Sequence, residues 1–194
     1  MKIKLITASL LFLSAIAYSQ TEATTKDGKK VILNKDMTWA YADCSALTET
    51  KTYAGGKVMT SSKEIFRVSA DGKTGIDISI LKGTGTIIFS FASVSKDIKC
   101  VDKGSPGIIE FTDGSKIAFK HMSDLNCKGS FSCFLGSALG SEAEAKAVQN
   151  KKIKTITLEY TKTENDNLVK HTEDFNVTTV QADSILKTIQ CLSN

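Results

Sequence analysis

Proline and arginine are almost absent from this chain of 194 residues, in which Pro106 and Arg67 are the only examples. A single proline and 13 glycines exclude collagen-like and proline-rich linker architectures. Scarce arginine argues against a protein that reads nucleic-acid sequence, because bidentate recognition of bases and phosphates relies on arginine. The formal net charge is only +4, which favours no strongly acidic partner. We therefore expect no nucleic-acid partner.

Groups for catalysis are also scarce, since His121 and His171 are the only histidines. No Gly-x-Ser-x-Gly elbow occurs, and residues 136–140 (GSALG) place their serine one position too early. Residues 83–85 (GTG) lack the Gly-Lys-Ser/Thr ending of a phosphate-binding loop and precede a predicted strand. The sequence therefore predicts no catalytic and no cofactor-binding residues. The alternative is a hydrolase with an unrecognised site that uses His121 or His171.

The residues that bind metal ions are poorly spaced for that purpose. His121, Cys127 and Cys133 are separated by five residues each, whereas zinc sites use shorter spacings. Residues 165–167 (NDN) lack the Asp-x-Asp-x-Asp-Gly pattern of a calcium loop. We therefore expect no metal site.

Long hydrophobic runs are missing except near the start, where residues 5–17 (LITASLLFLSAIA) follow two lysines. Ala17 and Ser19 supply the small side chains that a signal peptidase reads, so residues 1–19 are predicted to be a cleaved export signal. Thirteen residues at about 1.5 Å each are too few to cross a hydrocarbon layer of roughly 30 Å. We expect a soluble exported protein, periplasmic or extracellular, with no transmembrane segment in its mature form.

The hydrophobic fraction of 41% is sufficient for a core, and its pattern is that of β-strands. From residue 64 onward, apolar residues alternate with polar ones between turn residues, which predicts an antiparallel meander. The predicted strands are residues 65–68, 76–81, 86–92, 108–111, 116–119, 153–160 and 168–177. Residues 127–140 are rich in glycine and serine and are predicted to be a loop. Its Phe131 and Phe134 are expected to plug the end of the sheet or, alternatively, to contact a ligand.

Two helices are predicted. Ser141 and Glu144 fit a capping box ahead of a short helix, and Thr178 and Gln181 fit another at the C-terminal segment. The apolar stripe of the second helix consists of Ala182, Ile185, Ile189 and Leu192. The predicted fold class is α+β, mostly antiparallel β: a meander sheet or sandwich with a short helix and a C-terminal helix packed on it.

The region before the meander reads as a small hairpin between irregular segments. Residues 20–26 are expected to form a frayed arm, and residues 42–52 a linker or loop. Between them, a strand at residues 30–33 and a second strand with Trp39 and Tyr41 predict a hairpin, which must dock on a larger unit to be stable. The predicted organisation is a signal peptide (1–19), an N-terminal arm and Trp-containing hairpin (20–52), and an antiparallel β domain with a C-terminal helix (53–194).

Two segments resemble known sequences. Residues 27–41 (DGKKVILNKDMTWAY) resemble the DG-K-V-x-L-x-x-D-x-T-W hairpin near the start of many small exported bacterial proteins, with Met37 in the usual place of glycine. The part from Cys100 to Leu192 is similar to an uncharacterised domain of exported Bacteroidetes proteins. The matching segments are residues 100–104, 111–114, 126–127, 152–156 and 191–192. This resemblance implies an exported domain of unknown function and carries over no catalytic residue.

Five cysteines follow the predicted signal, so one remains unpaired if all bonds are intramolecular. An exported protein is expected to oxidise them. We predict a Cys100–Cys127 disulfide. Cys133 is the local competitor for Cys127, Cys191 is a further candidate partner, and Cys44 also remains open.

The predicted disulfide follows from the hairpin on either side of Asp113 and Gly114. A two-residue turn brings Cys100 directly opposite Cys127. A three-residue loop gives the better face pattern, with Ile109 opposite Ile117 and Glu110 opposite Lys116, but leaves the cysteines one residue out of line. A bulge at residues 104–107 then restores their alignment.

These observations favour an exported, non-enzymatic module that acts by binding or as a structural component of the cell envelope. The expected partner is an envelope protein or a small-molecule ligand, without cofactor or metal. The alternatives are the envelope hydrolase with an unrecognised site and an inhibitor or subunit of an envelope complex.

Overall fold

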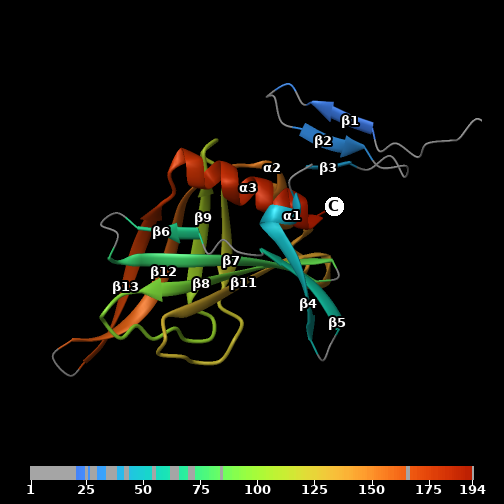
Figure 1. Ribbon diagram of the computed structural model, residues 1–194. Coiled ribbons are helices and arrows are strands. Elements are labelled where there is room, and N and C mark those ends of the chain that lie inside the picture. The colour runs from blue at the N-terminus through green and yellow to red at the C-terminus, as the bar shows by residue number, and fades with distance from the viewer. Residues whose placement is uncertain are drawn as a thin grey trace, which may run out of the picture.

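The computed structural model describes residues 21–24, 26, 30–33, 39–41, 44–53, 56–61, 66–69, 73–83, 85–164 and 167–193. The predicted export signal lies outside these residues, as do residues 34–38 and 165–166. Over the described residues the protein consists mostly of antiparallel strands with a C-terminal helix, which confirms the predicted α+β class (Figure 1).

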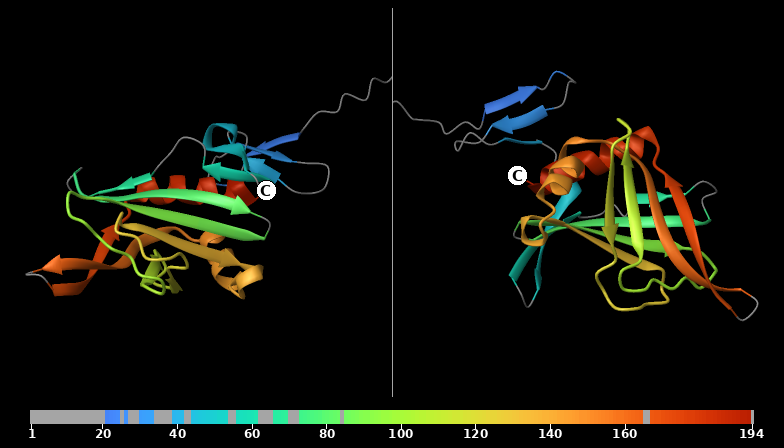
Figure 2. Two further views of the ribbon diagram at one scale, coloured as in Figure 1. Left: turned by 90° about the horizontal axis from the view of Figure 1, so that it is seen from below. Right: turned by 180° about the vertical axis from the view of Figure 1, so that it is seen from behind.

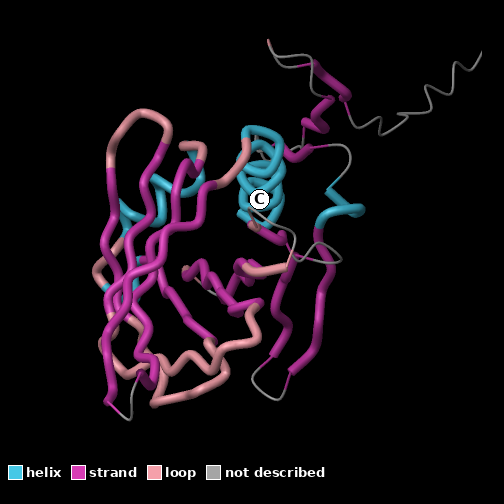
Figure 3. The backbone as a smooth tube through the Cα atoms, turned by 90° about the vertical axis from the view of Figure 1, so that its left-hand side faces the viewer, coloured by secondary structure: helices cyan, strands magenta, loops and turns pink. Residues whose placement is uncertain are grey.

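Two sheets form the body of the protein and face each other as a sandwich (Figure 3). The larger sheet has the order β11-β8-β7-β5-β4, with β6 also paired to β7. Its strands are β4 (Thr48–Tyr53), β5 (Gly56–Ser61), β6 (Phe66–Val68), β7 (Gly75–Gly83), β8 (Thr86–Val94) and β11 (Ser130–Gly136). The smaller sheet has the order β10-β9-β12-β13. Its strands are β9 (Pro106–Phe111), β10 (Lys116–Lys120), β12 (Ile153–Glu164) and β13 (Asn167–Asn176).

The core lies between the sheets because apolar side chains occupy alternate positions on their facing sides. Ile76, Ile78 and Ile80 on β7 pack with Phe89 and Phe91 on β8. The smaller sheet contributes Ile109, Phe111, Ile156, Leu158 and Tyr160 to the same cluster. The meander predicted from alternation is therefore present, but it is divided into two layers.

The C-terminal helix α3 (Thr179–Ser193) runs along one edge of the sandwich, above both sheets (Figure 2). Its predicted capping box forms: Gln181 N–H donates to Thr178 Oγ1 at 3.3 Å, and Thr178 N–H donates to Gln181 Oε1 at 2.9 Å. The predicted apolar stripe is buried, as Ile185 and Ile189 are at most 1% exposed. Helix α3 therefore closes the core.

The shorter helix α2 (Glu142–Asn150) is present, but Ser141 does not cap it with its side chain. Gly136 N–H instead donates to Ser141 Oγ at 2.9 Å, so this hydroxyl stabilises the turn before the helix. The predicted Gly/Ser-rich loop is wrong, because residues 130–136 form β11. Phe131 is buried in the core and Phe134 is half-buried in the strand, so they are not a plug or a ligand-contacting loop.

The N-terminal region is more ordered than the sequence predicts. The hairpin of β2 (Lys30–Leu33) and β3 (Trp39–Tyr41) is present, but the expected frayed arm contains β1 (Thr21–Thr24), which pairs with β2. The expected linker at residues 42–52 instead contains α1 (Cys44–Leu47) and most of β4, because β4 pairs with β5 of the larger sheet. The small sheet docks on the end of α3, where Val31 packs against Cys191. The Cys44–Cys191 disulfide joins α1, which follows this sheet, to α3.

The hairpin of β9 and β10 adopts the three-residue-loop register, with Ile109 opposite Ile117. His121 N–H donates to the Ser105 carbonyl in the same register, and beyond this point the pairing shifts by one residue, so that Val101 bridges Asn126. The extra residue is on the opposite segment, because four residues (122–125) separate His121 from Asn126 whereas three (102–104) separate Val101 from Ser105. The predicted bulge at residues 104–107 is therefore wrong, since Pro106 and Gly107 pair regularly with β10. Cys100 and Cys127 form a disulfide at this position. The competing pairs are absent, and Cys133 remains a free, buried thiol.

Candidate functional site

The side of the smaller sheet that faces the larger sheet changes from apolar to polar along β12 and β13. Ile156, Leu158 and Tyr160 belong to the core, and the next position on that side of β12 is Lys162. The opposite positions on β13 are Phe175, Glu173, His171 and Val169, of which Glu173 and His171 are polar. A polar end of the sandwich therefore lies farthest from α3 on these two strands.

Lys99 extends into this polar end and is only 5% exposed. Its Nζ lies 2.5 Å from Oε2 of Glu173 and 5.0 Å from the ring centroid of Tyr160. Lys162 Nζ lies 2.7 Å from the other carboxylate oxygen, Oε1 of Glu173. One carboxylate is thus shared by two ammonium groups, one of them buried.

The backbone around Lys99 explains how a loop residue reaches the interior. Cys100 forms an antiparallel bridge with Thr161 on β12, which aligns the loop with that strand next to Tyr160. Gly129 N–H donates to the Lys99 carbonyl at 2.8 Å. The Cys100–Cys127 disulfide holds the same two segments together. Lys99 is therefore positioned by three independent constraints.

The charges of this cluster are stabilised by one another. Burial raises the pKa of Glu173, but hydrogen bonds and charge from Lys162 and Lys99 outweigh that effect and hold the pKa below its usual range. Burial, with a further contribution from the Glu173 charge, raises the pKa of Tyr160, so its phenol stays neutral. Lys99, Lys162 and Glu173 together carry a net positive charge.

A cavity of about 320 Å³ opens beside the cluster, between the ends of β6 and β7 and the end of β13. Lys99, Glu173 and Asp174 contribute its charged wall. Val68 and Phe175 contribute apolar surface. This volume lies at the lower end of the range for ligand pockets. A cavity lined in this way is suited to a small molecule with both a charged and an apolar part.

Two buried hydroxyls add to the polar character of this end. Tyr160 Oη and Ser93 Oγ are buried and have no hydrogen-bond partner among the described residues. Ser93 and Lys99 both border Gly129, since a Cβ built there would lie 2.5 Å from Ser93 Cβ and 3.5 Å from Lys99 Cβ. Buried polar atoms are normally hydrogen-bonded, so these two hydroxyls make this end of the core unusually polar.

His121 lies elsewhere, where β10 approaches β11, and is 3% exposed. Ser132 N–H donates to His121 Nδ1 at 3.0 Å, so the imidazole covers the open edge of β11. The Ser132 hydroxyl lies 3.2 Å from the same nitrogen. Burial lowers the pKa of His121, which favours the neutral ring. Because Nδ1 accepts a backbone N–H, the imidazole is better suited to stabilising the junction of β10 and β11 than to transferring a proton.

His171 is on β13, opposite Tyr160, and is half-buried. The two histidines are therefore on different strands and in different surroundings, and the structure does not bring them into one site. A second hollow of about 350 Å³ borders His121, Ser123 and Lys128, but its histidine is the one at the junction of β10 and β11 described above. The polar end around Lys99 is the stronger candidate site.

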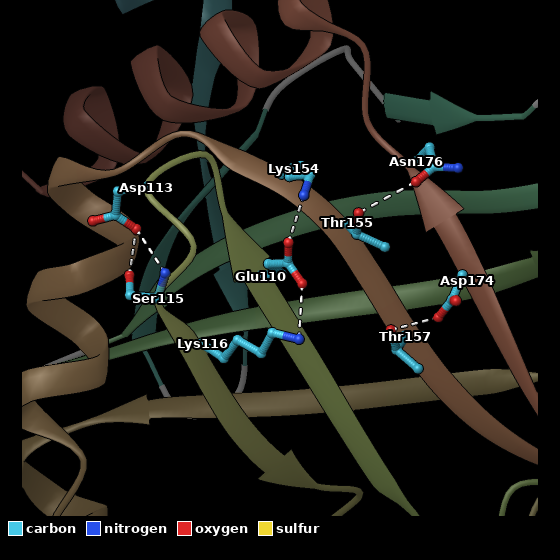
Figure 4. Close-up of polar contacts among 9 residues, drawn as sticks. All are labelled: Glu110, Asp113, Ser115, Lys116, Lys154, Thr155, Thr157, Asp174 and Asn176. Atoms are coloured by element: carbon cyan, nitrogen blue, oxygen red, sulfur yellow. Dashed lines mark hydrogen bonds and ion pairs between the residues drawn. The ribbon is translucent and has the colours of Figure 1, made fainter.

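The outer face of the smaller sheet carries a ladder of paired polar side chains (Figure 4). Glu110 forms ion pairs with Lys154 at 2.7 Å and with Lys116 at 2.9 Å, and these lysines lower its pKa to about 2. Thr157 donates to Asp174 at 2.6 Å. These groups satisfy one another across neighbouring strands, so the ladder is explained as stabilisation of an exposed sheet.

No group of three or more His, Cys, Asp or Glu side chains that could hold a metal ion occurs among the described residues. Cys127 is bonded to Cys100, and burial raises the pKa of the Cys133 thiol, which keeps it protonated. In the described part of the chain, no helix has both the length and the apolar character needed to cross a membrane.

Sequence reasoning missed Lys99, Tyr160, Lys162 and Glu173 as a site. Lys99 is one of 24 lysines, and no local pattern distinguishes it. A signal was present on β13, where Glu173 and His171 occupy the same side as the buried Phe175. Polar residues on the buried side of a strand indicate a polar interior.

Comparison with known proteins gives no relative: no protein-family model, no curated protein and no solved structure matches the chain. Function is therefore argued from the site itself.

Proposed function

We propose that this protein is an exported, non-enzymatic module that binds a small molecule in the cavity beside Lys99 and Glu173. The observation that carries the proposal is a lysine 5% exposed at the wall of a cavity of about 320 Å³. Burying an ammonium group is expensive even when it is paired, and apolar residues would stabilise the fold at least as well. A function in binding explains why charged groups occupy this position.

Export is part of the same proposal. Two disulfides are typical of proteins from oxidising compartments, and the predicted signal at residues 1–19 would deliver the chain there. The resemblance to an uncharacterised domain of exported Bacteroidetes proteins agrees with a periplasmic or extracellular location. Mass spectrometry of the protein secreted by its native host tests this point, because it would find Gln20 as the first residue.

The hydrolase alternative is less well supported. A general base needs a free lone pair directed at the nucleophile, whereas Nδ1 of His121 already accepts the Ser132 N–H. A hydrolase screen with His121→Ala and His171→Ala variants decides this. Turnover that depends on either histidine would overturn the non-enzymatic assignment. The remaining alternative, a subunit or inhibitor, predicts a stoichiometric partner on purification from the native host.

The binding proposal is tested by screening a library of polar metabolites with ¹H–¹⁵N correlation spectra. Ligands that bind at the site should shift the amide signals of Val68, Gly75 and Glu173 together. Lys99→Met removes the buried charge and should weaken such binding, while Lys103→Met, at a side chain that is 68% exposed, serves as the matched control. Shifts that map to other surfaces, or that persist unchanged in Lys99→Met, would overturn the proposal.

A further inference from the structure

We infer that two copies of this chain pair through the open edge of β13, so that their smaller sheets join into one continuous antiparallel sheet. β13 is the last strand of its sheet, and at ten residues it is the longest edge strand among the described residues (Figure 1). No described strand pairs with its outer side. An edge strand of this length presents a row of backbone groups that can pair with another chain.

The two edges of the smaller sheet differ in how far they are covered. At the β10 edge, Ser132 N–H on β11 donates to His121 Nδ1 at 3.0 Å, which closes this side of the sandwich. At the β13 edge, the cavity of about 320 Å³ separates the strand from the ends of β6 and β7. Its lining includes the consecutive residues 173–176. Because alternate side chains of a strand point to opposite faces, consecutive lining residues show that the cavity opens along the strand edge.

The hydrogen bonds of β12 show which backbone groups of β13 face outward. Thr161 N–H donates to the Cys100 carbonyl at 2.8 Å, and Cys100 N–H donates to the Thr161 carbonyl at 2.9 Å. Thr161 therefore bonds on the side of β12 away from β13. Lys170 is opposite Thr161 on β13, so its N–H and C=O groups point away from β12. The alternation places the same groups of residues 168, 172, 174 and 176 at the open edge.

The side chains of these residues are exposed, and their charges select one register for self-pairing. A two-fold axis at Thr172 brings Lys170 of each copy opposite Asp174 of the other. An axis at Lys170 or at Asp174 would place like charges opposite each other. An axis at His171 or at Glu173 would leave Lys170 opposite a neutral residue. The edge is therefore self-complementary about Thr172, as an isologous interface requires.

This pairing would extend the polar ladder on the outer face of the smaller sheet. Lys170 Nζ lies 2.8 Å from Glu159 Oε1 on β12. Thr157 on β12 donates to Asp174 at 2.6 Å (Figure 4). In the paired sheet, Lys170 lies between Glu159 and the Asp174 of the other copy, so the charges alternate across the strands. Opposite charges at facing positions stabilise strand pairing, whereas like charges destabilise it.

Charge exchange tests the interface. Sedimentation velocity of the chain without the predicted export signal, over about two decades of protein concentration, measures dimer formation. Lys170→Glu or Asp174→Lys places like charges opposite each other at both symmetry-related positions, so either should raise the dimer dissociation constant by about tenfold or more. The double variant Lys170→Glu/Asp174→Lys should restore it to within about threefold. Lys146→Glu makes the same charge change at an exposed lysine of α2 and should leave the dimer unchanged.

Cysteine cross-linking tests the register. Thr172→Cys places two thiols across the proposed axis, where the Cα atoms of a hydrogen-bonded pair are about 5.5 Å apart, within the range of a disulfide. Cys133 is buried and does not compete with the new thiol. A disulfide-linked dimer should appear on a non-reducing gel. Leu168→Cys is the matched control, because its two copies would lie roughly 27 Å apart along the strands and should not cross-link.

The outcomes that overturn the inference are distinct from those that bear on ligand binding. A monomer at all concentrations would overturn it, as would a dimer that forms equally well with Lys170→Glu. A dimer that cross-links through Leu168→Cys and not through Thr172→Cys would overturn it too. Circular dichroism checks that each variant folds, and if the charge variants do not fold, the cross-linking decides. Lys170 does not line the cavity, so these results leave the binding proposal to its own test.

Discussion

The two partners of the buried ion pair should respond very differently to substitution. Lys99 is 5% exposed and has one carboxylate contact, whereas Glu173 has a second lysine at 2.7 Å and a side chain that is 23% exposed. Glu173→Gln therefore leaves a buried ammonium without its counter-charge, which typically lowers the free energy of unfolding by about 3–5 kcal/mol. Lys99→Met keeps the side-chain volume and leaves Glu173 paired to Lys162. Its loss should be about 1 kcal/mol or less, as for partly exposed ion pairs.

Urea denaturation of the oxidised protein at pH 7 measures these losses, with unchanged m-values as the check on two-state behaviour. The double variant Lys99→Met/Glu173→Gln is the sharpest comparison. Because it removes the unpaired ammonium, it should be more stable than Glu173→Gln alone by about 2 kcal/mol or more. A double variant that is equally stable or less stable than Glu173→Gln would show that Lys99 is not buried as a charge, and the reasoning for the site would fail.

Three further predictions follow from other parts of the fold. Burial lowers the pKa of His121, so the folded protein favours the neutral ring more than the unfolded chain does. The free energy of unfolding should therefore be constant above about pH 6.5 and should decrease as the pH falls below that value. His121→Gln should flatten this part of a plot of urea midpoint against pH. Ile189 on α3 is 1% exposed, so Ile189→Ala should lower the free energy of unfolding by about 2–5 kcal/mol. A loss below about half a kcal/mol in denaturant unfolding would show that α3 is not docked on the core. Cys133 should not react with Ellman's reagent in the native protein, whereas the unfolded, unreduced chain should show one thiol; two or more would contradict the disulfides.

The parts of the fold that follow from local patterns could be predicted from the sequence. The stripe of α3 repeats at helical spacing, and its capping box is local to Thr178 and Gln181. The register of β9 and β10 follows from the turn residues between them, together with the pairing of Glu110 and Lys116. Each of these features depends on residues close in sequence, where side-chain chemistry decides the backbone conformation.

Strands that depend on distant partners were harder to predict. β4 and β5 (TETKTY and GKVMTS) carry few apolar residues, and they are strands because they pair with each other and then with β7. The β11 segment does alternate, with Phe131, Cys133 and Leu135 on its buried side, but glycine and serine around it suggest a loop. The small sheet is stabilised through docking at Cys191, a contact that composition does not reveal.

The strand residues of the candidate site could be predicted from the sequence, whereas the position of Lys99 could not. Lys162, His171 and Glu173 continue the inward side of two predicted strands, so the alternation itself contains the polar end of the core. Lys99 is different, because its position depends on the bridge from Cys100 to Thr161, sixty-one residues away along the chain. The Cys100–Cys127 disulfide fixes one side of that loop, but it does not specify the strand beside it. A buried ammonium over Tyr160 therefore arises only when the hairpin of β9 and β10 pairs with β12, and this long-range pairing is what converts an ordinary loop lysine into the central charge of the site.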